Sequence, residues 1–323
     1  MTRIRLIAFA AIILACAPAS VHAEPWPTRQ VRLVVPTPPG GSIDATARIL
    51  ANKLQQAWGQ NVMVENRPGA SMRIGADAVA KAPADGYTLL VAHDGALSMN
   101  AVVYAKLPYH PQRDFEPLPL IATAPEVFLT NVKTGVPDVR GFIDAAKRNP
   151  GKLTNASGGT NSLLYLELLK SIADVDILSV PYNGGAPAIN AVIAGDANMM
   201  IADLGTANPA LQSPSVKALA VTSATRSALM PDVPTMREAG VPGYEGRAWI
   251  GVFAPKGTPA DILAKLETDI AAVMRDGDYR ARLETFRMVP GDGRSSETRD
   301  IIADDMAKWG RVVRERHIEI DQN

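Results

Sequence analysis

Cysteine is almost absent from this 323-residue chain, and histidine is scarce. The one cysteine, Cys16, lies in an apolar stretch near the start, so residues 24–323 contain no thiol that could form a disulfide. Only His93, His110 and His317 follow residue 23, and no two of them have the spacing of ligands on a zinc-binding helix. The composition therefore excludes a disulfide-stapled fold, and we expect neither a metal nor another cofactor.

The sequence also lacks an excess of either sign of charge. Lysine and arginine together number 33, as do aspartate and glutamate, and no dense cluster of basic residues occurs. A protein that follows a phosphate backbone needs such a cluster, so we expect no nucleic-acid partner. With 47% hydrophobic and 20% charged residues, the composition is that of a folded globular protein, and the length suggests two domains.

The sequence also lacks the glycine motifs of nucleotide-binding proteins and hydrolases. No G-x-x-x-x-G-K-[ST] loop occurs, no G-x-G-x-x-G follows the first predicted strand, and no G-x-S-x-G is present. The first two motifs place backbone amides around a phosphate, and the third places a serine nucleophile at a sharp turn. Because they are missing, we expect a protein that is not an enzyme.

Residues 1–23 have the three parts of a secretory signal. Arg3 and Arg5 precede the apolar residues 6–17, and small residues lead to the cleavage sequence at residues 21–23. The apolar part is shorter than the ~20 residues that cross a bilayer, which argues against a retained membrane anchor. The protein is therefore predicted to be exported to the periplasm.

A lipid anchor is the alternative for this N-terminal segment. Residues 13–16 resemble the cleavage box of a bacterial lipoprotein, which would place a lipid on Cys16. Leu14 is too bulky to be typical of such a box, so the signal peptide is the favoured interpretation.

Short apolar runs rich in β-branched residues alternate with segments of helical spacing along residues 30–316. The first run, residues 30–35, ends at a turn rich in proline and glycine, and apolar residues at helical spacing follow as far as Trp58. The other predicted strands are residues 62–65, 88–92, 126–130, 153–156, 177–180, 199–202, 216–222 and 249–254. Strands that alternate with helices form a mostly parallel sheet covered on both faces, so the predicted fold class is α/β.

Two glycine-rich polar loops stand between a predicted strand and the helix after it. One is Gly40-Gly41-Ser42-Ile43-Asp44 and the other is Ser157-Gly158-Gly159-Thr160-Asn161-Ser162. Glycine lets the backbone approach a ligand, and the free amides and positive dipole end of a helix N-terminus favour an anion. Two such loops that face each other are predicted to hold a carboxylate. The alternative is that Ser42 and Ser162 only cap their helices.

Four further polar residues come directly after predicted strands: His93, Asp94, Tyr182 and Asp203. Open α/β sheets bind their ligands at the carboxyl ends of the strands, so we expect these side chains to line a cleft. A histidine beside an aspartate can also act as a general base with its orienting group. Ordinary turn chemistry remains an alternative for Tyr182 and Asp203.

Short motifs along the chain recur together in one known family. In chain order they are Trp26-Pro27, Val31-Arg32-Leu33-Val34-Val35-Pro36, Pro38-Pro39-Gly40-Gly41 with Asp44, Val64-Glu65-Asn66-Arg67-Pro68-Gly69-Ala70, Ile74-Gly75-Ala76, Asp85-Gly86-Tyr87-Thr88-Leu89-Leu90, Val180-Pro181-Tyr182, Pro231-Asp232-Val233-Pro234-Thr235 and Glu238-Ala239-Gly240. On these motifs the sequence resembles the periplasmic receptors of tripartite tricarboxylate transporters, the Bug family.

The resemblance implies a two-lobed type II periplasmic binding protein, each lobe a mixed, mostly parallel sheet flanked by helices. Lobe one is expected to comprise residues 24–124 and 225–323, with lobe two, residues 125–224, inserted between them. Proteins of this family close on a small carboxylate and deliver it to the subunits of a membrane permease. We accordingly expect a monomer whose partners are that ligand and the permease.

The resemblance also implies which residues grip the carboxylate. They are Gly40, Gly41, Ser42 and Asp44 in one loop and Gly159, Thr160, Asn161 and Ser162 in the other. The side of the site that selects the rest of the ligand departs from the family's pattern, because His93 and Asp94 stand where small hydroxyl residues are common and Leu163 stands where histidine is common. His93 is able to donate to a second polar group, whereas Asp94 disfavours a second carboxylate.

Two other functions are compatible with the sequence. A receptor of this kind could present its closed form to a membrane sensor instead of a permease. An exported hydrolase could use His93 and Asp94 to activate Ser157 or Ser162, which requires a base within hydrogen-bond reach of the serine.

Overall fold

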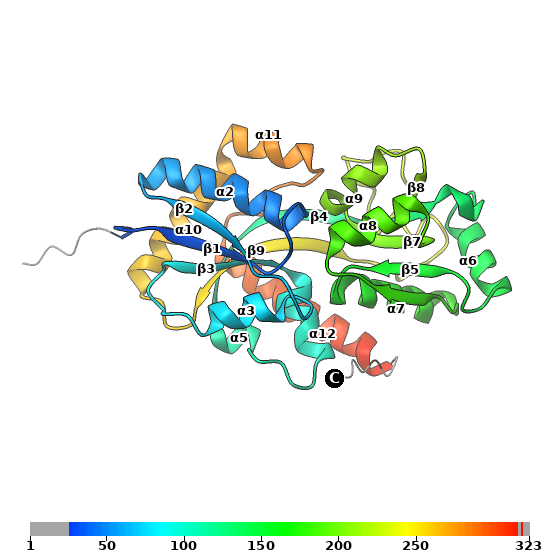
Figure 1. Ribbon diagram of the computed structural model, residues 1–323, viewed down its shortest axis with the longest axis horizontal. Coiled ribbons are helices and arrows are strands. Elements are labelled where there is room, and N and C mark those ends of the chain that lie inside the picture. Colours follow the sequence, from blue (N-terminus) through cyan, green and yellow to red (C-terminus); the bar gives the residue numbers. More distant parts are fainter. Residues whose placement is uncertain (1–25, 316–317, 319–323) are drawn as a thin grey trace, which may run out of the picture.

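Two α/β halves lie side by side in the computed structural model, which describes residues 26–315 and 318 (Figure 1). The strand β4 (Phe115–Asn131) runs through the sheets of both halves, and β9 (Arg247–Pro255) pairs with its first part as the chain returns to the first half. The predicted signal segment and Cys16 lie outside the described residues. Within residues 26–315, no helix combines the length and the hydropathy that a membrane span requires.

The sheet of the first half has the strand order β2-β1-β3-β9-β4. β1 (Val31–Val35) is parallel to β2 (Val62–Asn66) and β3 (Thr88–His93), while β9 is antiparallel to β3 and β4. The helical segments of this half are α2 (Ser42–Trp58), α3 (Arg73–Ala80), the π-helical turn η1 (Gly95–Met99), α4 (Asn100–Val103), α5 (Pro111–Asp114), α10 (Ala260–Arg275), α11 (Gly277–Thr285) and α12 (Ser295–Glu315).

The second half continues the sheet in the order β4-β7-β5-β6, with β8 also paired to β4. Its strands are β5 (Thr154–Ser157), β6 (Leu178–Pro181), β7 (Met199–Asp203) and β8 (Val216–Val221). β5 is parallel to β6 and β7, and β4 is antiparallel to β7 and β8. The helical segments of this half are η2 (Val132–Thr134), α6 (Val139–Arg148), α7 (Thr160–Ala173), α8 (Gly185–Ala194) and α9 (Leu204–Leu211).

The strand β4 changes its partners at the boundary between the halves. Its residues up to Pro125 pair with β9, and Glu126 is the first to pair with β7. Thr222 fastens the two chain crossings together at this point, because its hydroxyl accepts from the amide of Glu126 at 3.1 Å and donates to the carbonyl of Gly246 at 2.8 Å. Both connections between the halves are therefore hydrogen-bonded to one side chain.

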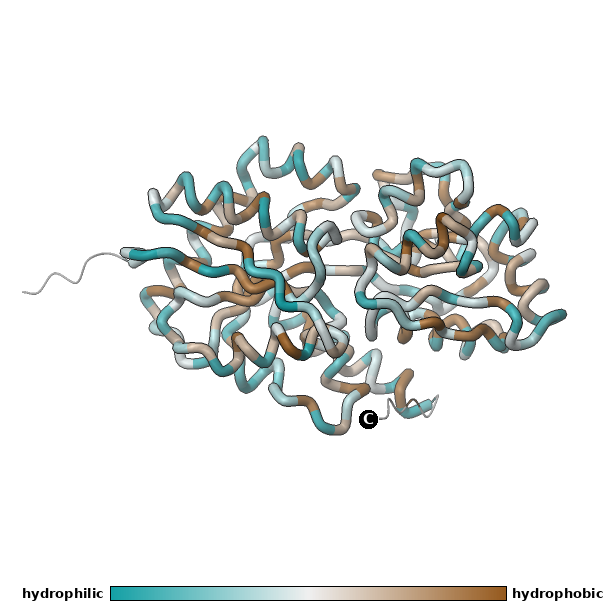
Figure 2. The backbone as a smooth tube through the Cα atoms, viewed as in Figure 1, coloured by the Kyte–Doolittle hydropathy of each residue, from teal (hydrophilic) through white to brown (hydrophobic). Residues whose placement is uncertain are grey.

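Buried apolar residues follow the central strands, and the outer helices alternate hydrophobic and hydrophilic residues (Figure 2). One core cluster covers the first half and extends into the second, and a smaller cluster fills the second half around Phe128 and Phe142. The end of α12 belongs to the smaller cluster through Trp309, whose ring lies 5.0 Å from that of Tyr165 on α7 in an edge-to-face contact. The last helix thus packs on both halves.

The predicted α/β class and the alternation of strands and helices are confirmed. One predicted strand is much too short, because residues 126–130 are only the end of the 17-residue strand β4. Prolines in the first part of β4 interrupt the apolar pattern that predicts a strand. The structure accommodates Pro117 because the pairing of β4 with β9 shifts its register between Pro117 and Ala122. Four α-helices are not predicted. α4 and α5 have only four residues each, α9 contains Pro209, and α11 buries only Tyr279 and Leu283.

Candidate functional site

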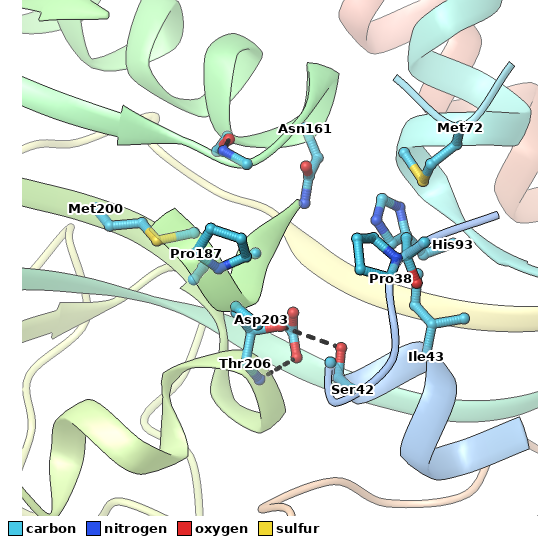
Figure 3. Close-up of a pocket in the computed structure, with 17 residues that line it drawn as sticks. Pro38, Ser42, Ile43, Met72, His93, Asn161, Pro187, Met200, Asp203 and Thr206 are labelled. Atoms are coloured by element: carbon cyan, nitrogen blue, oxygen red, sulfur yellow. Dashed lines mark hydrogen bonds between the residues drawn. The ribbon is translucent and has the colours of Figure 1, made fainter. Parts of the chain in front are cut away.

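A cleft between the two halves encloses about 560 Å³ of empty space, including its open mouth. The first half contributes Thr37, Pro38, Gly41, Ser42, Ile43, Met72 and His93, and the second half contributes Gly158, Asn161, Ser162, Gly185, Ala186, Pro187, Met200, Ala202, Asp203 and Thr206. Asn161, Pro187 and Asp203 form one wall, with His93, Pro38 and Met72 on the other (Figure 3). The predicted glycine-rich loops therefore come together from opposite halves.

Three helices begin at this cleft with a glycine in the capping position. The N-caps of α2, α7 and α8 are Gly41, Gly159 and Gly184, and no side chain caps any of them. Their first amides and the positive ends of three helix dipoles are thus directed to one space, which favours an anion there. The interpretation of Ser42 and Ser162 as helix caps is wrong, because Ser42 bonds to Thr206 across the cleft at 3.2 Å and the Ser162 hydroxyl accepts from the amide of Gly158 at 2.9 Å.

Hydrogen bonds to Asp44 fix the conformation of the first loop. Its buried carboxylate accepts hydrogen bonds from the amide of Gly40 at 3.0 Å, from Asn66 at 2.9 Å and from Arg48. Burial alone would raise the pKa of Asp44, but the bonds from Arg48, Gly40 and Asn66 outweigh it and keep the pKa below its usual value. Gly40 has φ of +94°, which favours glycine, so this turn is fixed by both sequence and hydrogen bonds.

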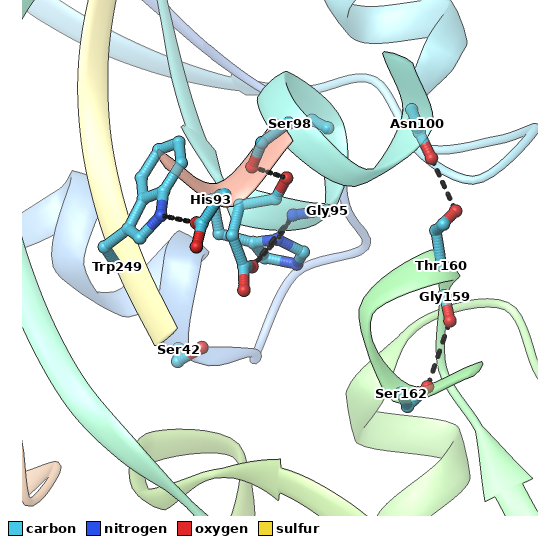
Figure 4. Close-up of polar contacts among 12 residues, drawn as sticks. Ser42, His93, Gly95, Ser98, Asn100, Gly159, Thr160, Ser162 and Trp249 are labelled. Atoms are coloured by element: carbon cyan, nitrogen blue, oxygen red, sulfur yellow. Dashed lines mark hydrogen bonds and ion pairs between the residues drawn. The ribbon is translucent and has the colours of Figure 1, made fainter. Parts of the chain in front are cut away.

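The second loop depends on a close approach between two backbone segments. A Cβ on Gly158 would lie 2.9 Å from the carbonyl oxygen of Gly184, so the starts of α7 and α8 lie this close only because position 158 is glycine. Thr160 is buried, and its hydroxyl donates to the side-chain oxygen of Asn100 in the first half (Figure 4). This bond, like that between Ser42 and Thr206, joins the two halves across the cleft.

An inner cavity continues from the cleft toward the crossing strands. Its empty space of about 260 Å³ includes its open side, and only about 10 Å³ admits the centre of a water-sized group, which is room for about one such group. Ser42, His93, Asn161 and Asp203 line both spaces, and the inner one adds Asp94 with Ala122, Thr123, Ala124, Ala248, Trp249, Ile250 and Met288. His93 Nδ1 lies 2.9 Å from Asp94 Oδ1, which also accepts from the amide of Gly95 at 2.8 Å. The same Gly95 amide also donates to His93 Nδ1 at 2.9 Å, which orients the imidazole (Figure 4).

Two further carboxyl groups lie buried near the inner cavity. Glu126 is fully buried, and burial together with the negative charges of Asp203 and Asp94 raises its pKa well above the usual range. Asp305 accepts from the indole nitrogen of Trp249 at 2.7 Å, and burial followed by the charge of Asp94 raises its pKa to about 6. The deep end of the site is thus acidic.

The twelve predicted site residues divide into two groups. Seven line the cleft or the inner cavity: Gly41, Ser42, His93, Asp94, Asn161, Ser162 and Asp203. The other five, Gly40, Asp44, Gly159, Thr160 and Tyr182, line neither space and belong to the loops and strand ends around it. In this structure they shape the site, and Thr160 fastens its two walls.

Sequence reasoning missed part of the lining. The start of α8 is not among the predicted site residues, although Asn183-Gly184-Gly185 repeats the glycine pair of the first loop and is the signal that could have found it. Trp249 and Met288 carry no local signal, because they reach the site through the pairing of β9 with β4 and the return of the chain after α11.

The hydrogen bonds give no support to a serine hydrolase. The Ser157 and Ser162 hydroxyls lie 3.1 Å apart, and each also donates to the carbonyl of Gly159. The Nδ1 atom of His93 is occupied by Gly95 and Asp94. Among residues 26–315 and 318, no group of three or more histidine, cysteine, aspartate or glutamate side chains is arranged to hold a metal ion.

Two α/β halves joined by paired strands around a cleft of helix N-termini define a two-lobed solute-binding protein. More particularly, the chain belongs to the tripartite tricarboxylate transporter receptor family, whose sequence pattern matches residues 46–318. The family is one of periplasmic solute receptors of transporters. The resemblance predicted from the sequence motifs is thereby confirmed.

Individual relatives extend over nearly the whole chain. Protein BugT of Bordetella pertussis is 35% identical over 323 residues, which cover 98% of each chain. The structure of R. palustris Rpa4515 with adipate superposes with a TM-score of 0.87 at 36% identity, covering 91% of this chain and 99% of the other. MatC from Rhodopseudomonas palustris with bound malate gives a TM-score of 0.85 at 33% identity, covering 89% of this chain and all of the other.

Proposed function

We propose that this chain captures a small carboxylate in the cleft between its two lobes and presents it to the permease subunits of a tripartite tricarboxylate-type transporter. The observation that carries the proposal is the convergence of three uncapped helix N-termini on one cleft. Carboxylate-bound relatives of the same family, with adipate in one and malate in another, support it. The site binds without catalysing a reaction, and the receptor acts as a monomer.

The proposed lobes are residues 24–124 with 225–323 and residues 125–224. The change of partners along β4 between Pro125 and Glu126 supports the first boundary. Ligand exchange requires the cleft to widen, and the crossing strands tied by Thr222 are the place about which the lobes turn. In the closed form the cross-cleft bonds of Ser42 and of Thr160 add to the contacts of the ligand.

The proposed place of action is the periplasm, with residues 1–23 serving as the export signal. The periplasmic receptors of the same family support this location. Expression of the full chain in a Gram-negative host, followed by mass spectrometry of the periplasmic fraction, tests it. A protein that begins at Glu24 is the expected product, and an N-terminal lipidated Cys16 would replace the signal-peptide interpretation by the lipoprotein one.

Thermal unfolding of residues 24–323 against a panel of carboxylates tests the receptor function. A ligand present at 100 times its dissociation constant stabilises the folded state by about 2.7 kcal/mol, which corresponds to a shift of several degrees. We expect a shift with one class of carboxylate and none with the uncharged amides of the same compounds. No shift with any carboxylate, on protein freed of retained ligand by unfolding and refolding, would contradict the proposal.

The variant Gly41→Val tests the position of the site. A Cβ at Gly41 meets no protein atom within 4 Å, and the residue has an extended backbone that valine also adopts, so the fold should persist while the branched side chain occupies the anion position. Binding of every carboxylate should be abolished. Gly277→Val is the matched control, because position 277 is equally open and lies at the start of α11 outside the cleft lining. If Gly41→Val binds carboxylates with unchanged affinity, the carboxylate does not bind at this loop.

A further inference from the structure

The cleft offers an anion many backbone amides but hardly any cationic side chain. Among the described residues that line the outer cleft or the inner cavity there is no lysine and no arginine. His93 is the one lining side chain there that can carry a positive charge, and its Nδ1 already faces Asp94 Oδ1 at 2.9 Å. A second carboxylate on the ligand would therefore meet no opposite charge at the deep end of the site.

The deep end instead presents a carboxyl oxygen without a partner. Asp94 lines the inner cavity with none of its surface exposed, and its Oδ2 has no hydrogen-bond partner among the described residues. The fully buried Glu126 lies outside the cavity lining, and a hydrogen bond with the Asn161 side chain counteracts the rise of its pKa. A buried carboxylate oxygen that lacks a donor is costly, so Asp94 Oδ2 indicates a site that a bound group completes.

The register of the sheet places a further carboxylate beside Glu126. Glu126 on β4 is directly opposite Asp203 on β7, and residues opposite each other in an antiparallel pair have Cβ atoms about 5 Å apart. Like charges at this distance repel each other. The charges of Asp203 and Asp94 both raise the pKa of Glu126, which shows that the three groups share one electrostatic environment.

The walls of the inner cavity suit an alkyl group that carries a positive charge. Trp249, Ile250, Met288 and small alanine residues supply apolar surface, and Asp94 and Asp203 supply negative charge. An ammonium group attached to a short carbon chain satisfies both kinds of surface. An aliphatic dicarboxylate satisfies only the apolar one and adds repulsion.

We propose that the inner cavity is a cation subsite and that the ligand is a zwitterion, with its carboxylate on the glycine loops and an ammonium group facing Asp94 Oδ2. This inference rests on the proposed carboxylate receptor function and names the ligand class of that site. The Gly95 amide keeps Asp94 Oδ1 engaged, which leaves Oδ2 for the ligand.

Calorimetric titration with matched compounds tests the inference. The probes are 4-aminobutanoate, 5-aminopentanoate and 6-aminohexanoate, the dicarboxylates succinate, glutarate and adipate, and the methyl-ended butanoate, pentanoate and hexanoate. The best ω-amino acid should bind at least about tenfold more tightly than the dicarboxylate of the same length, because a buried charge pair replaces a buried repulsion. Equal or tighter binding of the dicarboxylate would overturn the inference.

The variant Asp94→Asn identifies the group that selects the cation. Asparagine keeps the oxygen that accepts from Gly95 and loses the charge, so the amino compound should lose at least about tenfold in affinity while the methyl-ended compound changes little. Asp269→Asn is the matched control, since Asp269 accepts from the indole of Trp58 at 2.6 Å on α10 and lies outside both cavities. An equal loss in the control would overturn the assignment to Asp94.

The outcomes separate the two proposals. Methyl-ended acids or dicarboxylates that bind in a Gly41-dependent manner, without a preference for amino compounds, leave the receptor function standing and remove the cation subsite. No binding by any compound overturns both. If Asp94→Asn does not fold, the preference of the wild-type protein among the three series still decides. Asp203→Asn provides a second variant, because Asp203 lines the inner cavity and asparagine keeps the oxygen that accepts from the Thr206 amide. It is expected to weaken the preference for the amino compounds.

Discussion

The Tyr165 hydroxyl is a polar atom that the interior of the protein does not use. It is buried and has no hydrogen-bond partner among the described residues, whereas the hydroxyl of the neighbouring Tyr244 donates to the backbone carbonyl of Tyr165 at 2.7 Å. The two rings lie 6.4 Å apart in one aromatic cluster. This pair therefore offers a direct comparison of a satisfied and an unsatisfied hydroxyl in the same surroundings.

We predict opposite effects when each tyrosine is replaced by phenylalanine. Tyr165→Phe removes an unpaired polar group and should leave the free energy of unfolding unchanged or raise it by up to about 1 kcal/mol. Tyr244→Phe leaves a buried carbonyl without its donor and should lower it by about 1 kcal/mol or more. Urea unfolding measures both, and a larger loss in Tyr165→Phe than in Tyr244→Phe would contradict the prediction.

The carboxyl group of Asp305 makes stability depend on pH. Its pKa in the folded protein is about 6, above the value of about 3.9 for an unfolded chain, so folding binds this proton more tightly. The stabilisation is fully present below about pH 4 and is lost as the pH rises through 6. Asp305→Asn keeps an acceptor for Trp249 and does not titrate.

We therefore expect the difference in unfolding free energy between Asp305→Asn and the wild-type protein to move in favour of the variant from pH 4 to pH 7. The size of this change should be on the order of 2 to 3 kcal/mol. Denaturant unfolding at several pH values measures it. A difference that stays constant across this range would show that Asp305 ionises in the folded protein as it does in the unfolded chain.

Single residues could be predicted from the sequence where backbone geometry limits the choice of side chain. Gly41 and Ser42 were found because a glycine pair between a strand and a helix is visible locally, and His93 and Asp94 because they end a strand. Glu126 was not found, since its burial results from the pairing of β4 with β7. Local patterns identify the site loops, and tertiary pairing supplies the charges behind them.

Among the helices, α7 makes one of the hydrogen bonds that join the two sides of the cleft. The Thr160 hydroxyl at its start donates to Asn100, which begins α4 in the other half. Thr160→Val removes the donor, Asn100→Ala removes the acceptor, and either should weaken ligand binding by about 1 kcal/mol if closure forms this bond.

A double-mutant cycle on ligand affinity distinguishes closure from direct contact. If Thr160 acts through Asn100, the double variant should lose no more than the worse single variant, which gives a coupling energy of about 1 kcal/mol. If the Thr160 hydroxyl instead binds the ligand, the two losses should add. Affinities from calorimetry with the same carboxylate decide between the two cases.

The strands and helices of this chain were predictable to different degrees. β1, β3 and β7 are short, apolar and bounded by turns, so their positions are predicted to within a residue or two. β4 was shortened in the prediction because proline is unusual within a sheet, and the bulges that admit it are not visible in the sequence. α11 was missed because its few buried residues give almost no helical periodicity.

At the scale of the whole molecule, the closed form can be trapped by an engineered disulfide across the cleft. The Ser42 and Thr206 hydroxyl oxygens lie 3.2 Å apart across the cleft, and residues 24–323 contain no cysteine. A Ser42→Cys/Thr206→Cys double variant therefore has one possible pairing, and oxidation should link the two lobes.

The oxidised double variant should release bound ligand at least about a hundredfold more slowly than the same protein after reduction, because the lobes can no longer separate. Ligand release followed by stopped-flow competition measures this ratio. The single variant Ser42→Cys, treated in the same way, should show no dependence on reductant. Equal release rates before and after reduction of the double variant would show that ligand exchange does not need the lobes to part here.

The two-lobed architecture was predicted from family motifs, and its packing was not. The resemblance supplied the fold and the cleft, because the motifs lie in the loops that build them. The contact of Trp309 with Tyr165 was not predicted, since it joins residues on two helices far apart in the chain. Contacts of this kind depend on how the finished halves pack together.

The continuous course of β4 fixes how this chain can change in length during evolution. Val127 and Leu129 face the larger core and Phe128 faces the smaller one, so one inserted or deleted residue before them would exchange the two sets of side chains. The same shift would move Glu126 away from Thr222. Insertions and deletions among descendants of this sequence should therefore collect in the surface loops and leave residues 115–131 at constant length.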